Sequence, residues 1–450
     1  MKDRLPSTVG LLDSFHAHPF PATLLLITTL TACTVLPSNS DAASIIDREG
    51  AQLDLGGDIK GRFVAMQPYE HLLMPDDPIG QGLLMARARL ELSLADFLYV
   101  SAHHQLAGEL SSGSSGLSGS MLGDPSGQGT PEAIPLSWRA GEADSQVQLR
   151  GRMDRLSLRL RSSHATLTIG RQPITFGSTW FFTPLDRVAP FAATVIDREY
   201  KPGVDAIRGD FFFGTANQIT TVAAYAGGWQ LEGLVLAASG RFNVGLWDIT
   251  ALLAAAHGDF IAGLDASGSI GDIGLRGAIA YTVPPEESQE DAFLQVVFGG
   301  DYRSPSGLHF MAELYYQDIG AASTSGYLPL SQSPRFQRGE LWAMGRLYAA
   351  FSLNYELSPV LSTTTALTMN LLDGSALFSP GLSWSIAGNA DLVVGAMFAL
   401  GKRPRELDLT QLIGSDGRPI AGDQFVEVLQ PRSEFGLVPH TGYLQINSYF

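Results

Sequence analysis

The chain alternates apolar and polar residues in segments of about ten residues, and this pattern recurs along most of its length. The segment 274–283 places Leu275 and Ile279 on one side and Arg276 and Thr282 on the other. Because successive side chains of a β-strand point to opposite faces, each such segment predicts a strand with one apolar and one polar face.

Strands of this kind are stable when the sheet closes into a cylinder with lipid outside and water inside. In a soluble sandwich the polar face would have to form a packed core, and here it is too polar to do so. No internal run approaches the roughly 20 apolar residues of a membrane helix. The sequence therefore predicts an all-β fold, namely a transmembrane antiparallel β-barrel.

We predict about eighteen strands, with sixteen as the alternative, since bacterial barrels of one chain have an even number. The predicted strands are 51–66, 82–93, 97–109, 148–160, 164–173, 203–213, 216–227, 231–241, 244–256, 260–268, 272–283, 292–302, 306–317, 341–356, 360–371, 376–386, 390–401 and 434–450. Every long connection then falls on the same side of the barrel, as expected for extracellular loops. The long loops are 67–81, 110–147, 174–202, 318–340 and 402–433.

The N-terminus is typical of an export signal. Lys2 and Arg4 precede an apolar core at 22–35 that is too short for a membrane helix, and cleavage after Ala42 is expected. The division is therefore a signal peptide at 1–42 and a barrel at 43–450. In the alternative interpretation, Leu-Thr-Ala-Cys at 30–33 is a lipobox and Cys33 becomes lipidated.

Composition excludes several classes of function. The formal charge of −16 argues against a nucleic-acid partner. Cys33 is the only cysteine, and the nine histidines lack the spacing of metal ligands, so no metal or cofactor is expected. The sequence also lacks a phosphate-binding loop and a nucleophile elbow, which favours a protein that is not an enzyme. The acidic loops allow two interpretations, a solvated surface or contact with divalent cations and lipopolysaccharide.

Arginines concentrate on the polar faces of the predicted strands 82–93 and 148–160. They must face the lumen, because an arginine at the bilayer midplane would cost about 2–4 kcal/mol. An arginine ladder on a pore wall attracts anions, whereas in the alternative interpretation the arginines pair with carboxylates and only brace the wall. The predicted selectivity residues are Arg87, Arg89, Glu91, Arg155, Arg159, Arg161, Arg171, Arg208 and Asp210.

The loop 174–202 is unusual because it is aromatic, stiffened by proline and rich in paired charges. A loop so apolar is expected to fold back into the lumen as a constriction or to pack on the rim. Its predicted constriction residues are Trp180, Phe181, Phe182, Asp186, Arg187 and Phe191.

This region resembles the alginate-export and porin-like outer-membrane families. The resemblance rests on Gly-Arg-Gln at 170–172, Leu-Asp at 185–186 and Pro-Phe at 190–191. It implies a passive conduit with an arginine-lined lumen for anionic polymers or small solutes, and eighteen strands as in the alginate exporter. The alternating C-terminal segment 442–450 also looks like the closing strand of an outer-membrane barrel, whose terminal aromatic, here Phe450, is read by the insertion machinery.

Three functions follow as hypotheses. The first is a porin-like channel in the Gram-negative outer membrane for small, anionic solutes or a polymer. The second is a structural or adhesive barrel plugged by its loops, and the third is a surface hydrolase with a Ser/His or Asp/His pair near the outer rim. The expected partners are outer-membrane lipid and lipopolysaccharide, the insertion machinery and a small-molecule or polysaccharide solute. The sequence does not fix the solute, its direction of transport or the oligomeric state.

Overall fold

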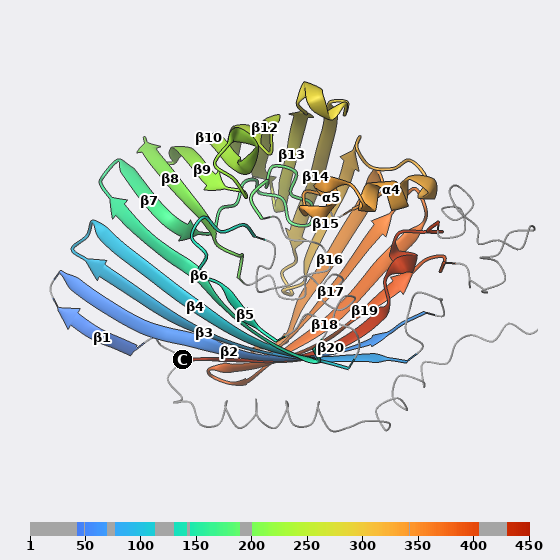
Figure 1. Ribbon diagram of the computed structural model, residues 1–450, viewed down its shortest axis with the longest axis horizontal. Coiled ribbons are helices and arrows are strands. Elements are labelled where there is room, and N and C mark those ends of the chain that lie inside the picture. Colours follow the sequence, from blue (N-terminus) through green and yellow to red (C-terminus); the bar gives the residue numbers. More distant parts are fainter. Residues whose placement is uncertain are drawn as a thin grey trace, which may run out of the picture.

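The computed structural model describes residues 43–48, 50–69, 77–112, 130–141, 145–189, 200–341, 343–404 and 430–450. Twenty β-strands in these ranges form one sheet (Figure 1). They are β1 Ala43–Arg48, β2 Ala51–Gln67, β3 Ile79–Leu94, β4 Leu98–Ser111, β5 Trp138–Ala140, β6 Val147–Arg161, β7 Ala165–Gln172, β8 Val204–Phe213, β9 Asn217–Tyr225, β10 Leu234–Val244, β11 Trp247–Ala256, β12 Asp259–Ile270, β13 Ile273–Val283, β14 Phe293–Arg303, β15 His309–Gln317, β16 Leu347–Ser358, β17 Leu361–Asn370, β18 Ser375–Ala387, β19 Ala390–Leu400 and β20 His440–Tyr449. The helices are short and include α4 Tyr327–Ser331, α5 Pro334–Gln337 and the 3-10 helix η6 Phe435–Leu437.

The sheet closes on itself because its first long strand meets its last. β2 pairs with β3 along one edge and with β20 along the other. All strand pairs are antiparallel, and the short strands β1 and β5 each pair with a single neighbour, β2 and β6 respectively. The other eighteen strands form the wall, so the predicted eighteen-stranded antiparallel barrel is confirmed.

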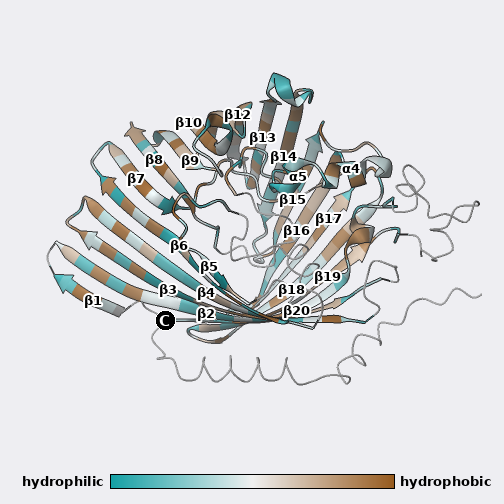
Figure 2. Cartoon of the chain, in the orientation of Figure 1, coloured by the Kyte–Doolittle hydropathy of each residue, from teal (hydrophilic) through white to brown (hydrophobic). Residues whose placement is uncertain are grey.

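Alternation decides which side chains face out of the barrel. On β6, Leu156 and Leu158 are 40% and 39% exposed, whereas Ser157 between them is 9% exposed. Figure 2 shows the same exchange of hydrophobic and hydrophilic residues along most strands. The apolar outer face suits acyl chains, and the polar groups of the other face line the interior.

A β-bulge in β6 changes which residues point inward. His103 of β4 pairs with Arg155, but His104 pairs with Met153, so Asp154 is an extra residue in β6. The bulge shifts the alternation by one position. Arg152 before it and Arg155 after it are therefore both buried on the inner side, although an unbroken strand would place them on opposite faces.

Connections of different length separate to the two ends of the barrel. Consecutive antiparallel strands place the short turns, such as 95–97 and 214–216, at one end, which we call the turn end. The opposite end, which we call the loop end, carries the connections between β7 and β8, β15 and β16, and β19 and β20. The helices α4 and α5 lie at the loop end, at the upper right of Figure 1.

Two predicted strands begin later than expected. The segment 341–346, predicted as the start of a strand, precedes β16, and 434–439 precedes β20. Their backbone groups bond to side chains instead: Gln317 donates to the carbonyls of Ala343 and Gly345, and the Met344 amide donates to Glu434. The alternating sequence therefore continues into a packed loop.

The predicted signal peptide 1–42 and Cys33 lie outside the described residues. β1 begins directly after that segment and pairs with the first residues of β2. In the part of the chain that the structure describes, no helix has the length and apolar character needed to cross a membrane.

Candidate functional site

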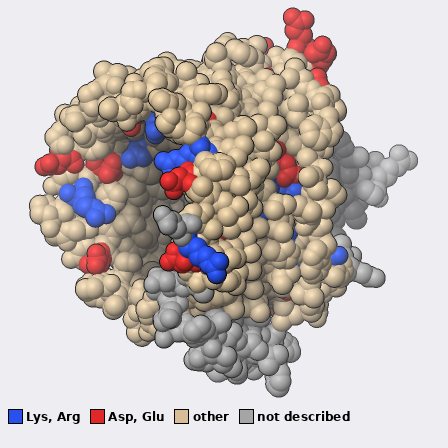
Figure 3. Space-filling view, turned by 90° about the vertical axis from the view of Figure 1, so that its left-hand side faces the viewer, with Lys and Arg blue, Asp and Glu red and all other residues tan. Residues whose placement is uncertain are grey.

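The lumen is the candidate site, because the polar side chains of the wall converge there. Figure 3 looks at the left-hand side of Figure 1 and shows a hollow with both basic and acidic groups along its edge and wall. We call the described residues of the β7–β8 connection, 173–189 and 200–203, the lumen loop, because they contact inner-face residues of the wall. Which strands hold this loop decides the shape of the site.

Glu313 of β15 fixes the centre of the lumen loop. Its carboxylate accepts hydrogen bonds from the backbone amides of Trp180 at 2.7 Å, Phe181 at 2.9 Å and Phe182 at 3.2 Å. Hydrogen bonds to an ionised group are stronger than neutral ones. Leu314, the next residue of β15, faces outward, so Glu313 reaches the loop from the inner face.

Neighbouring strands add further contacts to the same stretch. Asp265 of β12 accepts from the amide and the hydroxyl of Ser178 at 2.9 and 3.0 Å. The guanidinium of Arg276 on β13 donates to the Ser178 carbonyl and lies 3.4 Å from the centre of the Trp180 ring. The ring of Phe182 stacks on Tyr315 with ring centres 4.6 Å apart. The lumen loop is thus held against the β12–β15 part of the wall.

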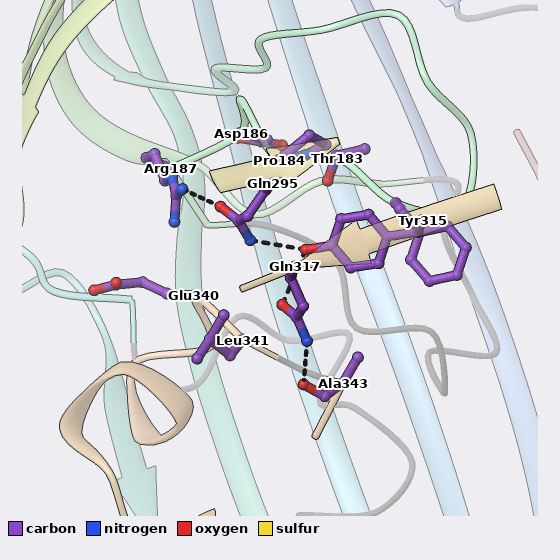
Figure 4. Close-up of a pocket in the computed structure, with 11 residues that line it drawn as sticks. Thr183, Pro184, Asp186, Arg187, Gln295, Tyr315, Gln317, Glu340, Leu341 and Ala343 are labelled. Atoms are coloured by element: carbon purple, nitrogen blue, oxygen red, sulfur yellow. Dashed lines mark hydrogen bonds between the residues drawn. The ribbon is translucent and has the colours of Figure 1, made fainter. Parts of the chain in front are cut away.

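Arg187 starts a chain of hydrogen bonds that crosses three strands (Figure 4). It donates to Thr282 of β13 and to Gln295 of β14, Gln295 donates to the Tyr315 hydroxyl, and that hydroxyl donates to Gln317. Arg187, Gln295, Tyr315 and Gln317 line a small pocket whose volume of about 20 Å³ is enough for about one water molecule. Burial lowers the pKa of Arg187.

The two ends of the lumen loop are joined by a buried ion pair. Lys201 Nζ donates to the Asp186 carboxylate and to the Ile174 carbonyl, both at 2.5 Å. Burial raises the pKa of Asp186 and lowers the pKa of Lys201. The predicted Asp186 therefore closes the loop on itself instead of facing a solute.

The end of the lumen loop reaches the opposite part of the wall, formed by β3, β4 and β6. The guanidinium carbons of Arg87 and Arg155 lie 3.6 and 4.5 Å from the centre of the Tyr200 ring. The Tyr200 hydroxyl bonds to Nδ1 of His103, and Nε2 of His103 bonds to Glu91. The lumen loop therefore bridges two parts of the barrel wall.

The predicted arginines of β3 and β6 lie on the inner face but differ in their partners. Arg87 pairs with Asp58 at 3.4 Å and Arg155 with Asp154 at 3.2 Å. Arg89 donates to the Gly57 carbonyl. Arg150, Arg152 and Arg155 each have an ion-pair partner, whereas no carboxylate among the described residues lies within ion-pair distance of Arg89, Arg159 or Arg161.

Arg208 and Asp210 of β8 form an inner-face pair of their own, with the guanidinium Nε 2.9 Å from the carboxylate. Asp210 also accepts from Gln218 and Thr220 of β9. This part of the wall is braced, as the alternative interpretation of the arginines expected. Phe191, the last predicted constriction residue, lies outside the described residues.

Arg171 does not join the inner wall, which corrects its predicted position. It pairs in register with Leu156, which faces outward, and with Asp205. Its guanidinium bonds to Asp205 at 2.7 Å, to Glu132 at 2.9 Å and to the carbonyls of Met153 and Ile134. Arg171 therefore fills the gap in the wall where β7 ends and the segment 130–141 packs against β6.

Sequence reasoning missed several lumen residues. Lys60 and Arg62 of β2 are buried on the inner side, and their alternation with apolar residues could have identified them. Alternation places Glu313 on the polar face of β15, but no local pattern indicates that it binds a loop 131 to 133 residues earlier in the chain. Tyr200 and His103 meet only because the loop folds inward.

A second polar cluster closes part of the loop end. We call Tyr327, Tyr348, Asn370, Asp373 and Glu434 the mouth cluster. Glu434 accepts from the Tyr348 hydroxyl and from Asn370, and Asp373 accepts from the Tyr327 hydroxyl at 2.9 Å and from the Glu434 amide at 2.7 Å. Burial raises the pKa of Glu434 to about 7. The cluster ties α4 and the β19–β20 connection to the ends of β16 and β17.

The described residues contain few pairs of side chains that resemble a catalytic site. Within the described residues, the only Ser–His hydrogen bond joins the neighbours Ser163 and His164 in an exposed turn at the turn end. His309 bonds to Asp301 beside another turn at that end. No group of three or more metal-ligating side chains occurs in the described ranges.

The closed eighteen-stranded barrel with a loop folded into a polar lumen defines the porin-type class of β-barrel folds. The chain is similar to Acinetobacter baumannii OccAB1, with 10% identity and a TM-score of 0.51 over 91% of this chain and 98% of that one. A BenF-like porin from Pseudomonas fluorescens Pf-5 gives 10% identity and a TM-score of 0.51 over 89% and 99%, and Pseudomonas aeruginosa OccK5 (OpdH) gives 8% and 0.51 over 88% and 98%. No protein-family model and no curated protein matches the chain. At such low identity the similarity establishes the fold.

Proposed function

We propose that the chain is an outer-membrane channel of Gram-negative bacteria through which small solutes, preferentially anions, pass down their gradients. The barrel is closed, apolar outside and polar inside, and this arrangement needs no cofactor and no covalent chemistry to conduct solutes. The porin-type fold supports the same reading.

The observation that carries the anion preference is the position of Arg89 and Arg159. Both lie on the inner face toward the turn end, and no carboxylate in the described residues is close enough to form an ion pair with either. Arg159 is exposed and Arg89 partly so. A guanidinium that forms no ion pair in a pore raises the local concentration of anions.

Reversal potentials in planar bilayers under a KCl gradient test this proposal. The wild-type channel is expected to pass chloride more readily than potassium. Arg89→Ala and Arg159→Ala should each lower the permeability ratio by about twofold, since a unit charge about 8 Å away in water contributes about 0.5 kcal/mol. Cation preference in the wild type would refute the anion claim, and absence of conductance would refute the channel.

Arg48→Ala is the matched control. Arg48 is exposed on β1, which pairs only with the first residues of β2 and lies outside the wall. Removing this arginine changes the net charge equally but leaves the inner face intact. An equal effect of Arg48→Ala would assign the selectivity to total charge instead of the lumen.

A plugged structural or adhesive barrel is the second candidate, and one observation favours it. Tyr327 of α4 and Glu434 lie buried in the mouth cluster, so two loops pack into the loop end. If purified protein inserts into bilayers, shown by protease protection of its strands, but conducts no current, the plugged barrel replaces the channel.

The cargo and partners belong to the same proposal. The resemblance of 170–172, 185–186 and 190–191 to the alginate-export family adds an anionic polymer as a second class of cargo. We further propose an N-terminal export signal at 1–42, lipid and lipopolysaccharide around the barrel, and recognition of the Phe450 strand by the insertion machinery. A hydrolase is disfavoured because the described Ser–His pair lies in a turn, away from the loop end where surface substrates would bind.

A further inference from the structure

Tyr200 covers two buried arginines of the inner wall. The guanidinium carbons of Arg87 and Arg155 lie 3.6 and 4.5 Å from the centre of its ring. Both distances fall within the range in which a cation is attracted to an aromatic ring. The ring is neutral and covers two guanidinium groups, each of which also pairs with a wall carboxylate, Asp58 for Arg87 and Asp154 for Arg155.

The hydroxyl of Tyr200 is also committed to the wall. Burial raises the pKa of Tyr200, so the hydroxyl stays protonated and can donate. His103 links the hydroxyl to the wall, because its Nδ1 bonds to Tyr200 and its Nε2 bonds to Glu91. The side chain of Tyr200 therefore has a defined position, with Arg87 and Arg155 against its ring and His103 at its hydroxyl.

Contacts within the lumen loop also fix the position of Tyr200. Arg155 donates to the Lys201 carbonyl, and Lys201 forms the ion pair with Asp186 that joins the two ends of the lumen loop. The fold of the lumen loop thus fixes the position of Tyr200, because the adjacent Lys201 cannot move without breaking its buried ion pair with Asp186.

We propose that Tyr200 determines the specificity of the lumen by capping Arg87 and Arg155, which form a latent binding site for small carboxylates. This inference rests on the proposed channel function and deepens it. The capped arginines differ from Arg89 and Arg159, because the described cation–π contacts with the Tyr200 ring come from Arg87 and Arg155 alone.

The groups around the Tyr200 ring indicate which class of ligand could bind there. Removing the ring would leave the guanidinium groups of Arg87 and Arg155 facing the vacated space, each still paired with its wall carboxylate, Asp58 or Asp154. The terminal nitrogens of Arg87 bond to Asp58 and Gln105, whereas its Nε has no partner among the described residues and can donate to a carboxylate oxygen. A small planar carboxylate such as acetate is the anion that this set of donors fits.

Arginine labelling tests the cap without requiring conduction. Folded protein in detergent is treated with phenylglyoxal, and the labelled peptides are quantified by mass spectrometry. Tyr200→Ala should increase the labelling of Arg87 and Arg155 about threefold to tenfold, the range expected from losing a partly buried cation–π contact. Labelling of Arg89 and Arg159 should stay unchanged, and Tyr200→Phe, which keeps the ring, should behave like the wild type.

Bilayer recordings test the consequence for selectivity. With potassium chloride and potassium acetate gradients, Tyr200→Ala should raise the anion-to-cation permeability ratio, and more so for acetate. Tyr200→Phe should leave both ratios near the wild-type values. If Tyr200→Ala does not fold, Tyr200→Leu replaces it, because leucine fills much of the space but offers no aromatic face.

The outcomes separate this inference from the proposed function. Unchanged labelling of Arg87 and Arg155 in the folded variant overturns the cap, whatever the wild type conducts. Increased labelling with unchanged permeability ratios, in a wild type that prefers anions, overturns the specificity role. A wild type that prefers cations or does not conduct defeats the proposed function, while the labelling result still decides whether Tyr200 caps the arginines.

Discussion

Arg171 illustrates how one register position decides the role of a charged residue. Its side chain is 1% exposed and bonds to Asp205, Glu132 and two backbone carbonyls. A buried arginine with this many partners compensates its own desolvation and satisfies groups that would otherwise be unpaired. We therefore expect Arg171 to stabilise the barrel and to contribute little to selectivity.

Arg171→Ala tests this expectation. The substitution leaves two carboxylates and two carbonyls without their partner, so the free energy of unfolding should fall by about 3–5 kcal/mol. Arg171→Lys should also be destabilising, since lysine cannot reproduce the fork of hydrogen bonds. The measurement is urea unfolding of the refolded barrel, with Arg89→Ala as the control expected to change stability little. If Arg171→Ala unfolds at the wild-type urea concentration but has an altered reversal potential, Arg171 contributes to selectivity and not to stability.

Sequence reasoning succeeds for residues within regular strands and fails where the register changes. Alternation placed Arg87, Arg89 and Arg159 on the inner face, where the structure has them. The sequence predicted that Arg171 faces the lumen, but β7 ends beside it and the segment 130–141 covers its side chain. The bulge at Asp154 could not be predicted either, since no residue type or local pattern in β6 marks the position of the extra residue.

The lumen loop is the element on which the proposed constriction depends. Its aromatic and proline-rich sequence predicted that it would not extend into solvent. Its anchors could not be predicted, because Glu313, Asp265 and Arg276 come from strands that follow the loop by many residues. These long-range contacts depend on the assembled barrel.

Glu313→Ala should release the lumen loop. Three backbone amides lose a charged acceptor, and each unsatisfied buried donor costs about 1–3 kcal/mol. Single-channel conductance should rise and its current noise should increase, because the loop no longer holds one position. Glu356→Ala is the control, since Glu356 lies exposed at the end of β16. Conductance equal to the wild type in a folded Glu313→Ala barrel would show that this loop does not limit the pore.

The mouth cluster gives the loop end a dependence on pH. Burial raises the pKa of Glu434 from 4.5 to about 7, and no described cation forms an ion pair with it. The folded state therefore binds the proton more tightly than the unfolded chain. Its contribution to stability is full below about pH 4.5 and decreases as the pH rises toward about 7, by about 3 kcal/mol at most.

Hydrogen–deuterium exchange measures this effect. The peptide spanning α4 and α5 should exchange faster at pH 8 than at pH 5, after correction for the intrinsic exchange rate. Glu434→Gln, which stays neutral, should remove most of the difference, whereas Glu356→Gln should retain it. Equal protection of the wild-type peptide at both pH values would contradict the assigned role of Glu434.

At the scale of the whole molecule, the strand number was predictable for a physical reason. Each strand crosses the membrane once, so an error of one strand would place long loops at both ends. The eighteen predicted segments each correspond to one strand of the wall. The loops that enter the lumen were less predictable, because their positions depend on contacts between distant parts of the chain.

The pairing of β2 with β20 has a consequence for biogenesis. Asp58 lies opposite Tyr449, and the Phe450 backbone exchanges two hydrogen bonds with Gly57, where a larger residue would collide with the Phe450 ring. The cylinder cannot seal until β20 reaches β2, although almost the whole wall separates these two strands along the chain. Until then two unpaired edges persist, each able to recruit a foreign strand. A chain that lacks β20 would therefore stay open and prone to aggregate.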